Sequence, residues 1–224
     1  MSAALAGRRI VVSAGPTYED IDPVRFLGNR SSGKMGFAIA AEAAALGAEV
    51  LLVAGPVHLP TPAGVQRMDV RSAAQMHAAV TDAIRIGDAA CDCYIGAAAV
   101  ADFTPRAAAA NKLKKQPGQD TLQLDLVKTR DILADVAAHA RRPRLVVGFA
   151  AETDNVAEYA RGKLQRKRVD MICANRVGLA GSGFEADDNA LLVIDADGER
   201  ALGPASKAEL ARALLALVAA RLED

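Results

Sequence analysis

Tryptophan is absent from this chain of 224 residues, and only three cysteines and three histidines are present. The odd number of cysteines, two of which form a Cys91-x-Cys93 pair in an apolar run, argues against a disulfide framework. It favours a reducing cytoplasm as the location. The histidines His58, His77 and His139 lie far apart in the sequence, so we expect no metal site built from His and Cys ligands.

The chain also lacks an excess of either charge and any long apolar run. Its 27 basic and 27 acidic side chains cancel, which argues against a general nucleic-acid binder. No apolar stretch approaches the roughly 20 residues that cross a membrane, and no signal-peptide pattern opens the chain. We expect residues 1–7 to be a loose leader and residues 8–224 to form one domain, because a domain typically has roughly 100–200 residues.

What the sequence does contain is an alternation of short apolar runs and helical patterns. The apolar runs predict buried strands at Arg9–Ser13, Glu49–Ala54, Cys93–Ala98, Arg144–Phe149 and Asp170–Ala174. The helical patterns cover Gly36–Leu46, 72–86, 131–139, Val156–Arg168 and Lys207–Leu222. Buried strands separated by helices predict an α/β fold, with a mostly parallel sheet and helices on both faces.

Local signals add detail to this plan. Ser72, Thr129 and Ser206 are suitable N-caps for the helices that follow them, and Gly47 is a suitable stop for the first helix. Asp197-Gly198 predicts a late β-hairpin, and the alternating segment Thr121–Val127 predicts an edge strand. The segment from about 104 to 120 breaks the rhythm, and we interpret it as a flap, with a solvated linker as the alternative.

Ligands of such sheets bind beyond the carboxyl ends of the strands, so the loops at those ends are the places to search. The loop at 14–36 contains Gly28 and Gly33-Lys34, a spacing like that of a phosphate-binding Walker A loop, but Met35 stands where the Mg²⁺-binding Ser or Thr belongs. What remains is a possible anion site at the start of a helix, around Ser31, Ser32 and Gly33; a plain helix cap is the alternative.

Three further segments carry two interpretations each. The small residues from Gly96 to Asp102 would allow a ligand to approach closely. The alternative is ordinary strand packing, with Asp102 as a helix cap. Lys112, with two neighbouring lysines, suits a flap that closes over phosphates, or a solvated charge run. Lys163 and Lys167 lie four residues apart on one helix face, where two like charges repel each other. This indicates an anion bound between them; the alternative is a solvated basic face.

Taken together, the motifs are more specific than any one of them. AGPT, IDPVRFLGNRSSGKMGFAIA, LVAGPV, LPTP, AAVADF, KLKKQ, VVGFAAET and ICAN follow one another from residue 14 to residue 175. In this combination the chain resembles the phosphopantothenoylcysteine synthetase family, in the bacterial type that uses CTP. That type is commonly the C-terminal half of a bifunctional coenzyme A biosynthesis protein. The resemblance implies a three-layer, Rossmann-like (ribokinase-like) α/β fold.

The resemblance also implies a reaction. The carboxylate of 4′-phosphopantothenate attacks the α-phosphate of CTP, pyrophosphate leaves, and an acyl-cytidylate forms. The amine of cysteine then attacks the acyl carbon and CMP departs. Mg²⁺ is implied as a companion of the triphosphate rather than as an ion held by a protein cage. The family further implies a homodimer, with the region 22–34 near the subunit contact, and a flavin-dependent decarboxylase as a fused or associated partner.

Residue roles follow from the matching positions. The resemblance implies catalytic roles for Asn29, in processing the acyl-cytidylate, and for Lys112, in the first half-reaction. It implies nucleotide binding by Gly96, Ala97, Ala98, Asp102, Lys112, Arg130, Asp131, Ile132, Leu133, Phe149, Lys163 and Lys167. It implies binding of the phosphorylated acid by Arg25, Ser31, Ser32 and Gly33. Arg130 departs from the family pattern, which usually has proline there.

Two other functions remain as alternatives. An α/β sheet with Gly-rich turns also suits an NAD(P)-binding oxidoreductase, but no G-x-G-x-x-G follows the first strand. A non-catalytic nucleotide-binding module has less need of a lysine-rich flap. We therefore expect a ligase whose partners are CTP, 4′-phosphopantothenate and cysteine.

Overall fold

The chain is described by a computed structural model that covers residues 3–86, 91–115, 117–118, 120–152, 154–176 and 188–223. Met1 and Ser2 of the predicted leader, Gln116 and Gln119 of the predicted flap, Thr153 of the VVGFAAET motif and Asp224 of the predicted domain lie outside the described residues.

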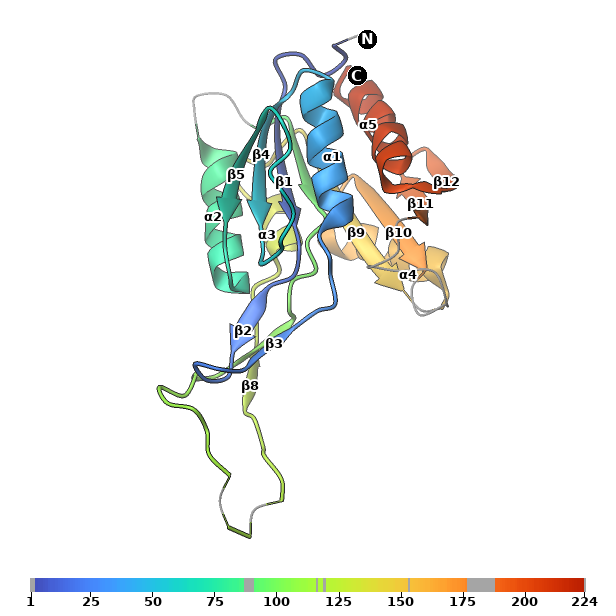
Figure 1. The fold of residues 1–224 in the computed structure, drawn as a ribbon. Coiled ribbons are helices and arrows are strands. Elements are labelled where there is room, and N and C mark those ends of the chain that lie inside the picture. The colour runs from blue at the N-terminus through green and yellow to red at the C-terminus, as the bar shows by residue number, and fades with distance from the viewer. Residues whose placement is uncertain are drawn as a thin grey trace.

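An eight-stranded sheet forms the centre of the molecule (Figure 1), with the strand order β12-β11-β10-β9-β6-β1-β4-β5. All neighbours are parallel except at β11, which pairs antiparallel with both β10 and β12. The strands are β1 (Arg9–Ala14), β4 (Glu49–Ala54), β5 (Val65–Asp69), β6 (Cys93–Gly96), β9 (Leu145–Glu152), β10 (Met171–Arg176), β11 (Asp188–Asp195) and β12 (Gly198–Ser206). The predicted strands and the late hairpin are confirmed, whereas β5 is polar and was not predicted.

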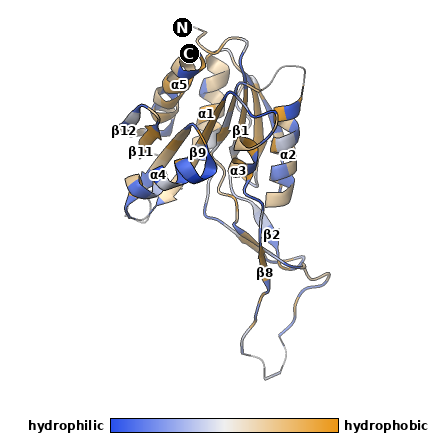
Figure 2. Cartoon of the chain, turned by 180° about the vertical axis from the view of Figure 1, so that it is seen from behind, coloured by the Kyte–Doolittle hydropathy of each residue, from blue (hydrophilic) through white to orange (hydrophobic). Residues whose placement is uncertain are grey.

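Five helices of the described residues cover the two faces of this sheet: α1 (Lys34–Ala45), α2 (Ala73–Arg85), α3 (Ile132–Ala137), α4 (Val156–Lys167) and α5 (Lys207–Glu223). One hydrophobic cluster packs α1 and α5 against one face, and a second packs α2, α3 and α4 against the other. The strands are the most hydrophobic elements, while α4 is largely hydrophilic (Figure 2) and buries only Ala160 completely. The three-layer α/β fold is therefore confirmed.

Helix α1 starts unusually close to the central strand β1. Gly33, its N-cap, has a φ of 74°, which a side chain disfavours. A Cβ atom on Gly36 would collide with the side chain of Ala14 and lie 3.2 Å from its Cα. The two glycines thus allow the first turn of α1 to approach the end of β1 without a side chain in between.

The caps of the other helices agree only in part with the prediction. Ser72 and Gln75 form a reciprocal capping box on α2, and Gly47 has the positive φ of a helix stop. Thr129 is wrong as the cap of α3: Asp131 is the N-cap and accepts a hydrogen bond from the backbone nitrogen of Ala134. The Thr129 hydroxyl instead donates to the Ala101 carbonyl at 2.6 Å.

Two small hairpins form an arm that leaves the sheet beyond the carboxyl ends of its parallel strands (Figure 1). One pairs β2 (Tyr18–Asp20) with β3 (Phe26–Gly28), and the other pairs β7 (Phe103–Pro105) with β8 (Leu126–Lys128). The prediction of an edge strand at Thr121–Val127 is therefore wrong. Only its last two residues are in a strand, which pairs with β7 outside the main sheet, since the polar segment before it has no core to face.

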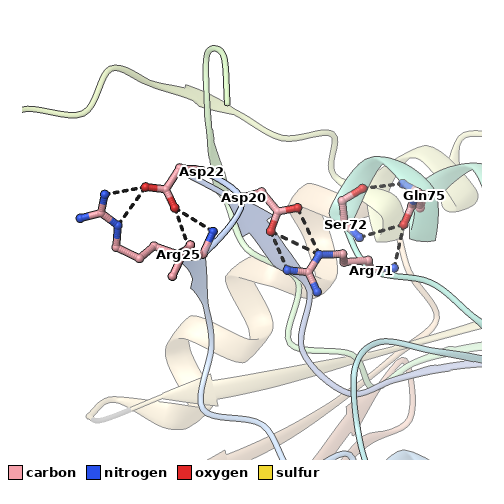
Figure 3. A network of polar contacts seen from close by, with 7 residues as sticks. Asp20, Asp22, Arg25, Arg71, Ser72 and Gln75 are labelled. Atoms are coloured by element: carbon pink, nitrogen blue, oxygen red, sulfur yellow. Dashed lines mark hydrogen bonds and ion pairs between the residues drawn. The ribbon is translucent and has the colours of Figure 1, made fainter. Parts of the chain in front are cut away.

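The base of the arm is held by charged contacts (Figure 3). The Arg71 guanidinium pairs with Asp20, and that of Arg25 pairs with Asp22 at 2.5 Å. Asp22 also accepts a hydrogen bond from the backbone nitrogen of Leu113, and Arg25 donates to the Leu113 carbonyl. The Arg25 guanidinium lowers the pKa of Asp22 well below its usual value. These contacts fix one point of the predicted flap to the β2–β3 hairpin.

The segment predicted as a loose leader is packed at its end. Leu5 is completely buried in the cluster under α1 and α5, and its backbone nitrogen donates to the Leu46 carbonyl.

Candidate functional site

A pocket of about 800 Å³ lies at the carboxyl ends of β1, β6, β9 and β10. The order of the strands also predicts a ligand site at this edge. After β1, the chain first forms β4 on one side of β1 in the sheet and later forms β6 on the other side. Such a reversal leaves a crevice between the connections on the two faces. The volume is within the range of small-molecule sites, roughly 300–1,000 Å³.

The pocket brings together the predicted site residues from segments far apart in the chain. Those that line it are Asn29, Ser31, Ser32, Gly33, Gly96, Ala97, Ala98, Asp102, Arg130, Asp131, Ile132, Leu133, Phe149, Lys163 and Lys167. Two predicted residues, Arg25 and Lys112, do not line it. Arg25 belongs to the clamp at the base of the arm, and Lys112 is exposed on the arm itself.

Asn29 follows β3 and is held by two hydrogen bonds. Its side-chain nitrogen donates to the carbonyls of Ala99 and Val100, each at 3.1 Å. Both N–H groups of the amide are therefore used, and its oxygen has no hydrogen-bond partner among the described residues. The amide presents an acceptor, not a donor, to a ligand in this geometry.

The start of α1 forms one wall of the pocket. Gly33 caps the helix without a side-chain hydrogen bond, while Ser31 accepts a bond from the Gly33 nitrogen at 3.3 Å. The residues Ser31 to Gly36 line the pocket, so the positive end of the α1 dipole faces it. This geometry favours the anion-site interpretation of the segment over that of a plain side-chain cap.

The turn before α3 forms the opposite wall and is fixed at three points. The backbone nitrogen of Thr129 donates to the Asp102 carbonyl. Arg130 pairs with Asp135, which also contacts His77 at 2.8 Å. Asp131 pairs with Lys167 of α4. The turn is thus bound to the residue before β7 and to α4, and it is linked to α2 through Asp135. Residues 130–133 all line the pocket.

The two lysines of α4 both have carboxylate partners within the chain. Lys167 lies 2.8 Å from Asp131, and Lys163 lies 3.6 Å from Glu152. Burial alone would raise the pKa of Asp131, but the hydrogen bonds from Lys167 and the Ala134 nitrogen outweigh it, and the pKa is lowered. The repulsion between the lysines is thus relieved without a bound anion, and an anion would share them with these carboxylates.

Ser13 and Tyr94 close the floor of the pocket. The two hydroxyl groups lie 2.9 Å apart, and burial raises the pKa of Tyr94 to about 12. Tyr94 therefore stays protonated at neutral pH. Asp102 lines the rim, and its carboxylate makes no ion pair within the described residues.

Sequence reasoning missed several polar residues of the pocket: Lys34, Lys128, Asn175, Asn189 and Lys207. Asn175 directly follows the strand predicted at Asp170–Ala174, so its position was available from the sequence. Asn189 and Lys207 come from β11 and α5, and only the antiparallel pairing of β11 brings them to this edge.

No group of three or more His, Cys, Asp and Glu side chains in the described part of the chain is arranged to hold a metal ion. Among the same residues, no helix is long and apolar enough to cross a membrane.

Comparison with known proteins identifies the family to which the chain is similar. A family model described as "DNA/pantothenate metabolism flavoprotein C-terminal domain" matches residues 5–222. Two relatives share the description "Coenzyme A biosynthesis bifunctional protein CoaBC". The one from Vibrio cholerae is 50% identical over 214 residues, which cover 96% of this chain and 53% of the relative. The one from Escherichia coli K12 is 49% identical over 216 residues, which cover 96% and 52%. The chain thus spans about half the length of these curated relatives.

One solved structure matches over the whole of both chains. It is a crystal structure of the C-terminal domain of a coenzyme A biosynthesis bifunctional protein CoaBC, with 40% sequence identity and a TM-score of 0.82. Both chains are covered completely, so the arm and the late hairpin belong to the shared region.

Proposed function

Because this chain belongs to the DNA/pantothenate metabolism flavoprotein C-terminal domain family, we propose that it is a phosphopantothenoylcysteine synthetase. The proposal covers a ligase of coenzyme A biosynthesis that joins 4′-phosphopantothenate to cysteine at the expense of CTP. The observation that carries it is the pocket in which Asn29, Asp102 and the 130–133 turn meet.

The reaction has two steps, and each needs something that the pocket offers. A carboxylate oxygen of the acid attacks the α-phosphorus of CTP, and the bond to pyrophosphate breaks. The cysteine nitrogen then attacks the acyl carbon, loses a proton, and the acyl–phosphate bond breaks to release CMP. The first step needs positive charge near phosphates, and the second needs a group that orients an amine.

Asn29 suits the second step through its side-chain oxygen. Its two N–H groups hold the Ala99 and Val100 carbonyls, so the amide plane is fixed. The free oxygen can accept a hydrogen bond from the attacking amine and direct its lone pair at the acyl carbon. Because both N–H groups are already engaged, Asn29 does not donate a hydrogen bond to the acyl oxygen as negative charge develops on it.

The nucleotide is proposed to lie between the start of α1 and the turn before α3. The backbone of residues 130–133 would face the base, Phe149 would pack against the nucleotide, and Lys163 and Lys167 would contact its phosphates. Mg²⁺ would enter with the triphosphate. The rim carboxylate of Asp102 fits such an ion, which usually keeps several waters and takes one or two carboxylates in addition to phosphates.

An oxidoreductase of the NAD(P)-binding type fits the geometry less well. The dinucleotide fingerprint needs a tight turn that leads directly from the first strand into a helix. Here β1 ends at Ala14 and α1 begins at Lys34, with the β2–β3 hairpin between them.

The proposed partners include a second copy of the chain. The arm exposes large apolar side chains, which are Val24, Phe26, Phe103, Leu122 and Leu126. Exposed apolar clusters of this kind are typical of interfaces between proteins. A flavin-dependent decarboxylase is the proposed fused or associated partner. The cytoplasm is the proposed location, which agrees with the three free thiols.

The test is mass spectrometry of a mixture of the protein, CTP, Mg²⁺, 4′-phosphopantothenate and cysteine. We expect 4′-phosphopantothenoylcysteine, CMP and pyrophosphate in equal amounts. In a control without cysteine, the acyl-cytidylate should accumulate. Replacement of CTP by ATP in parallel tests the choice of base. No amide product with either nucleotide, together with binding of NAD(P)H, would reject the proposal.

A further inference from the structure

Two lysines of α4 line the pocket, and carboxylates of the chain already balance their charge. Lys163 and Lys167 lie one helical turn apart. Lys167 pairs with Asp131, and Lys163 lies 3.6 Å from Glu152. The proposed function assigns the triphosphate to these lysines. A phosphate group that arrives here therefore meets cations that already have anionic partners.

The two carboxylates differ in where they lie. Asp131 lines the pocket and its side chain is 47% exposed, whereas Glu152 is not among the lining residues and its side chain is 20% exposed. The Nζ of Lys167 lies 2.9 Å from Oδ1 of Asp131 and 2.8 Å from Oδ2. These are distances at which a charged nitrogen donor binds a carboxylate or phosphate oxygen. Asp131 thus holds Lys167 from inside the pocket, as a phosphate group would.

Asp131 is both fixed in place and charged. It is the N-cap of α3, and its Oδ1 accepts a hydrogen bond from the backbone nitrogen of Ala134 at 3.1 Å. Burial by itself raises the pKa of Asp131, but the hydrogen bonds from Lys167 and Ala134, together with the positive charge of both lysines, lower it. Asp131 is therefore ionised at neutral pH, and its bond to the helix keeps it in position when Lys167 turns away.

Lys167 is the partner that can move. Its ammonium group stands at the end of a flexible four-carbon stem, in the last turn of α4, and its side chain is 23% exposed. An ion pair that reaches solvent is weak, because water screens the attraction and holding two side chains together costs entropy. A phosphate group that carries more negative charge than one carboxylate can therefore take Lys167 from Asp131.

We propose that Asp131 competes with the phosphates of the nucleotide for Lys167, and that this competition helps pyrophosphate to leave. The inference rests on the proposed function, which places the triphosphate at these lysines. When the β- and γ-phosphates bind, Lys167 turns from Asp131 to a phosphate oxygen. When pyrophosphate departs, Lys167 pairs with Asp131 again, and no covalent bond changes in the exchange. The carboxylate of Asp131 thus lowers the affinity of the pocket for phosphates instead of contributing to it.

The experiment measures binding of CTP, inorganic pyrophosphate and CMP by isothermal titration calorimetry, in Mg²⁺ and at low ionic strength. The variant is Asp131→Asn, which removes the charge and keeps the cap of α3, since Asn and Asp are equally good N-caps. Loss of a competing ion pair of this exposure corresponds to a gain in affinity of about two- to fivefold. We expect that gain for pyrophosphate and CTP. CMP has no β- or γ-phosphate and should bind as it does to the unmodified chain.

Two further variants show whether the gain passes through Lys167. In a chain that carries Lys167→Met, the additional change Asp131→Asn should alter the affinity for pyrophosphate much less, because the carboxylate has no Lys167 to hold. Asp125→Asn is the matched control: it removes one negative charge from an exposed ion pair with Arg106 on the arm. It should bind all three ligands as the unmodified chain does.

The outcomes separate this inference from the proposed function. Unchanged or weaker binding of pyrophosphate by Asp131→Asn, with circular dichroism showing the native fold, would overturn the inference. So would an equal gain for CMP, an equal gain in the Lys167→Met chain, or an equal gain from Asp125→Asn. The titration with pyrophosphate needs no turnover, whereas the proposed function fails separately, when the unmodified chain forms no amide product.

Discussion

Replacement of Gly36 by alanine should destabilise the fold, whereas the same replacement at Gly162 should stabilise it. Both glycines are inside helices, α1 and α4, so both changes gain helix propensity, up to about 1 kcal/mol. They differ in what a new methyl group meets. At Gly162 the nearest atom is the Nη1 of Arg166 at 3.3 Å, the end of a flexible side chain. At Gly36 the methyl group collides with Ala14 of β1.

The magnitude follows from this difference. Ala14 lies in β1, which is paired on both sides, with β4 and with β6, and therefore cannot move away. Forcing one methyl group into such packing typically costs about 1–3 kcal/mol. Because the gain in propensity is common to both variants, the difference between their free energies of unfolding isolates that cost. We expect Gly36→Ala to be about 1–3 kcal/mol less stable than Gly162→Ala.

Urea unfolding, followed by circular dichroism, measures this difference from the midpoints, provided that the slopes agree. A second readout is ligand binding, since the first turn of α1 lines the pocket. The displaced turn of Gly36→Ala should weaken the binding of CTP, while Gly162→Ala should bind as before. Equal midpoints and equal binding for the two variants would refute the close packing of α1 on β1.

Further predictions concern the arm, the thiols and the chemistry. Arg25 lowers the pKa of Asp22, so this clamp stabilises the arm above the ordinary carboxyl pKa of 3.8 and loses its effect as the pH falls below it. Asp22→Asn should therefore speed tryptic cleavage within 106–125 at pH 7, and unchanged cleavage would argue against the clamp. Burial raises the pKa of Cys91 to about 11 and those of the other two thiols as well, so a thiol reagent at pH 8 should label them only after unfolding; rapid labelling of the folded chain would contradict this. Asn29→Asp, which removes the N–H groups that hold the side chain, should still release pyrophosphate but stall before the amide, a split visible in separate assays of the two products. Lys112→Gln should suppress pyrophosphate release, and normal consumption of CTP by this variant would remove Lys112 from the reaction.

The parallel part of the fold is predictable from the sequence because its strands are buried on both sides. Runs such as 49–54 and 144–149 are almost entirely apolar. The arm is not predictable in the same way. Strands β2, β3 and β7 are only three residues long and face little core, so their sequences show no period. The polar edge strand β5 was missed for the same reason.

The site shows a similar division. Residues near the ends of predicted parallel strands, such as Gly96 and Asp102, can be assigned to one edge of the sheet from topology alone. Lys207 cannot, because its place depends on the antiparallel turn of β11. Arg25 is a different case: the resemblance implies contact with a substrate, and in this structure its guanidinium pairs with Asp22. The sequence does not reveal the partner of a side chain, and without it a substrate contact cannot be told from an ion pair within the chain.

The antiparallel course of β11 has a consequence for synthesis on the ribosome. Every parallel strand of the sheet, and four of the five described helices, precede residue 188, so most of the core can assemble while the chain is still being translated. Helix α5 nevertheless borders the pocket through Lys207 and buries Leu210, Leu214 and Val218 in the core. A nascent chain therefore holds the parallel framework before it has a finished cavity, and it gains a complete binding surface only after the 17 residues of α5 have left the exit tunnel.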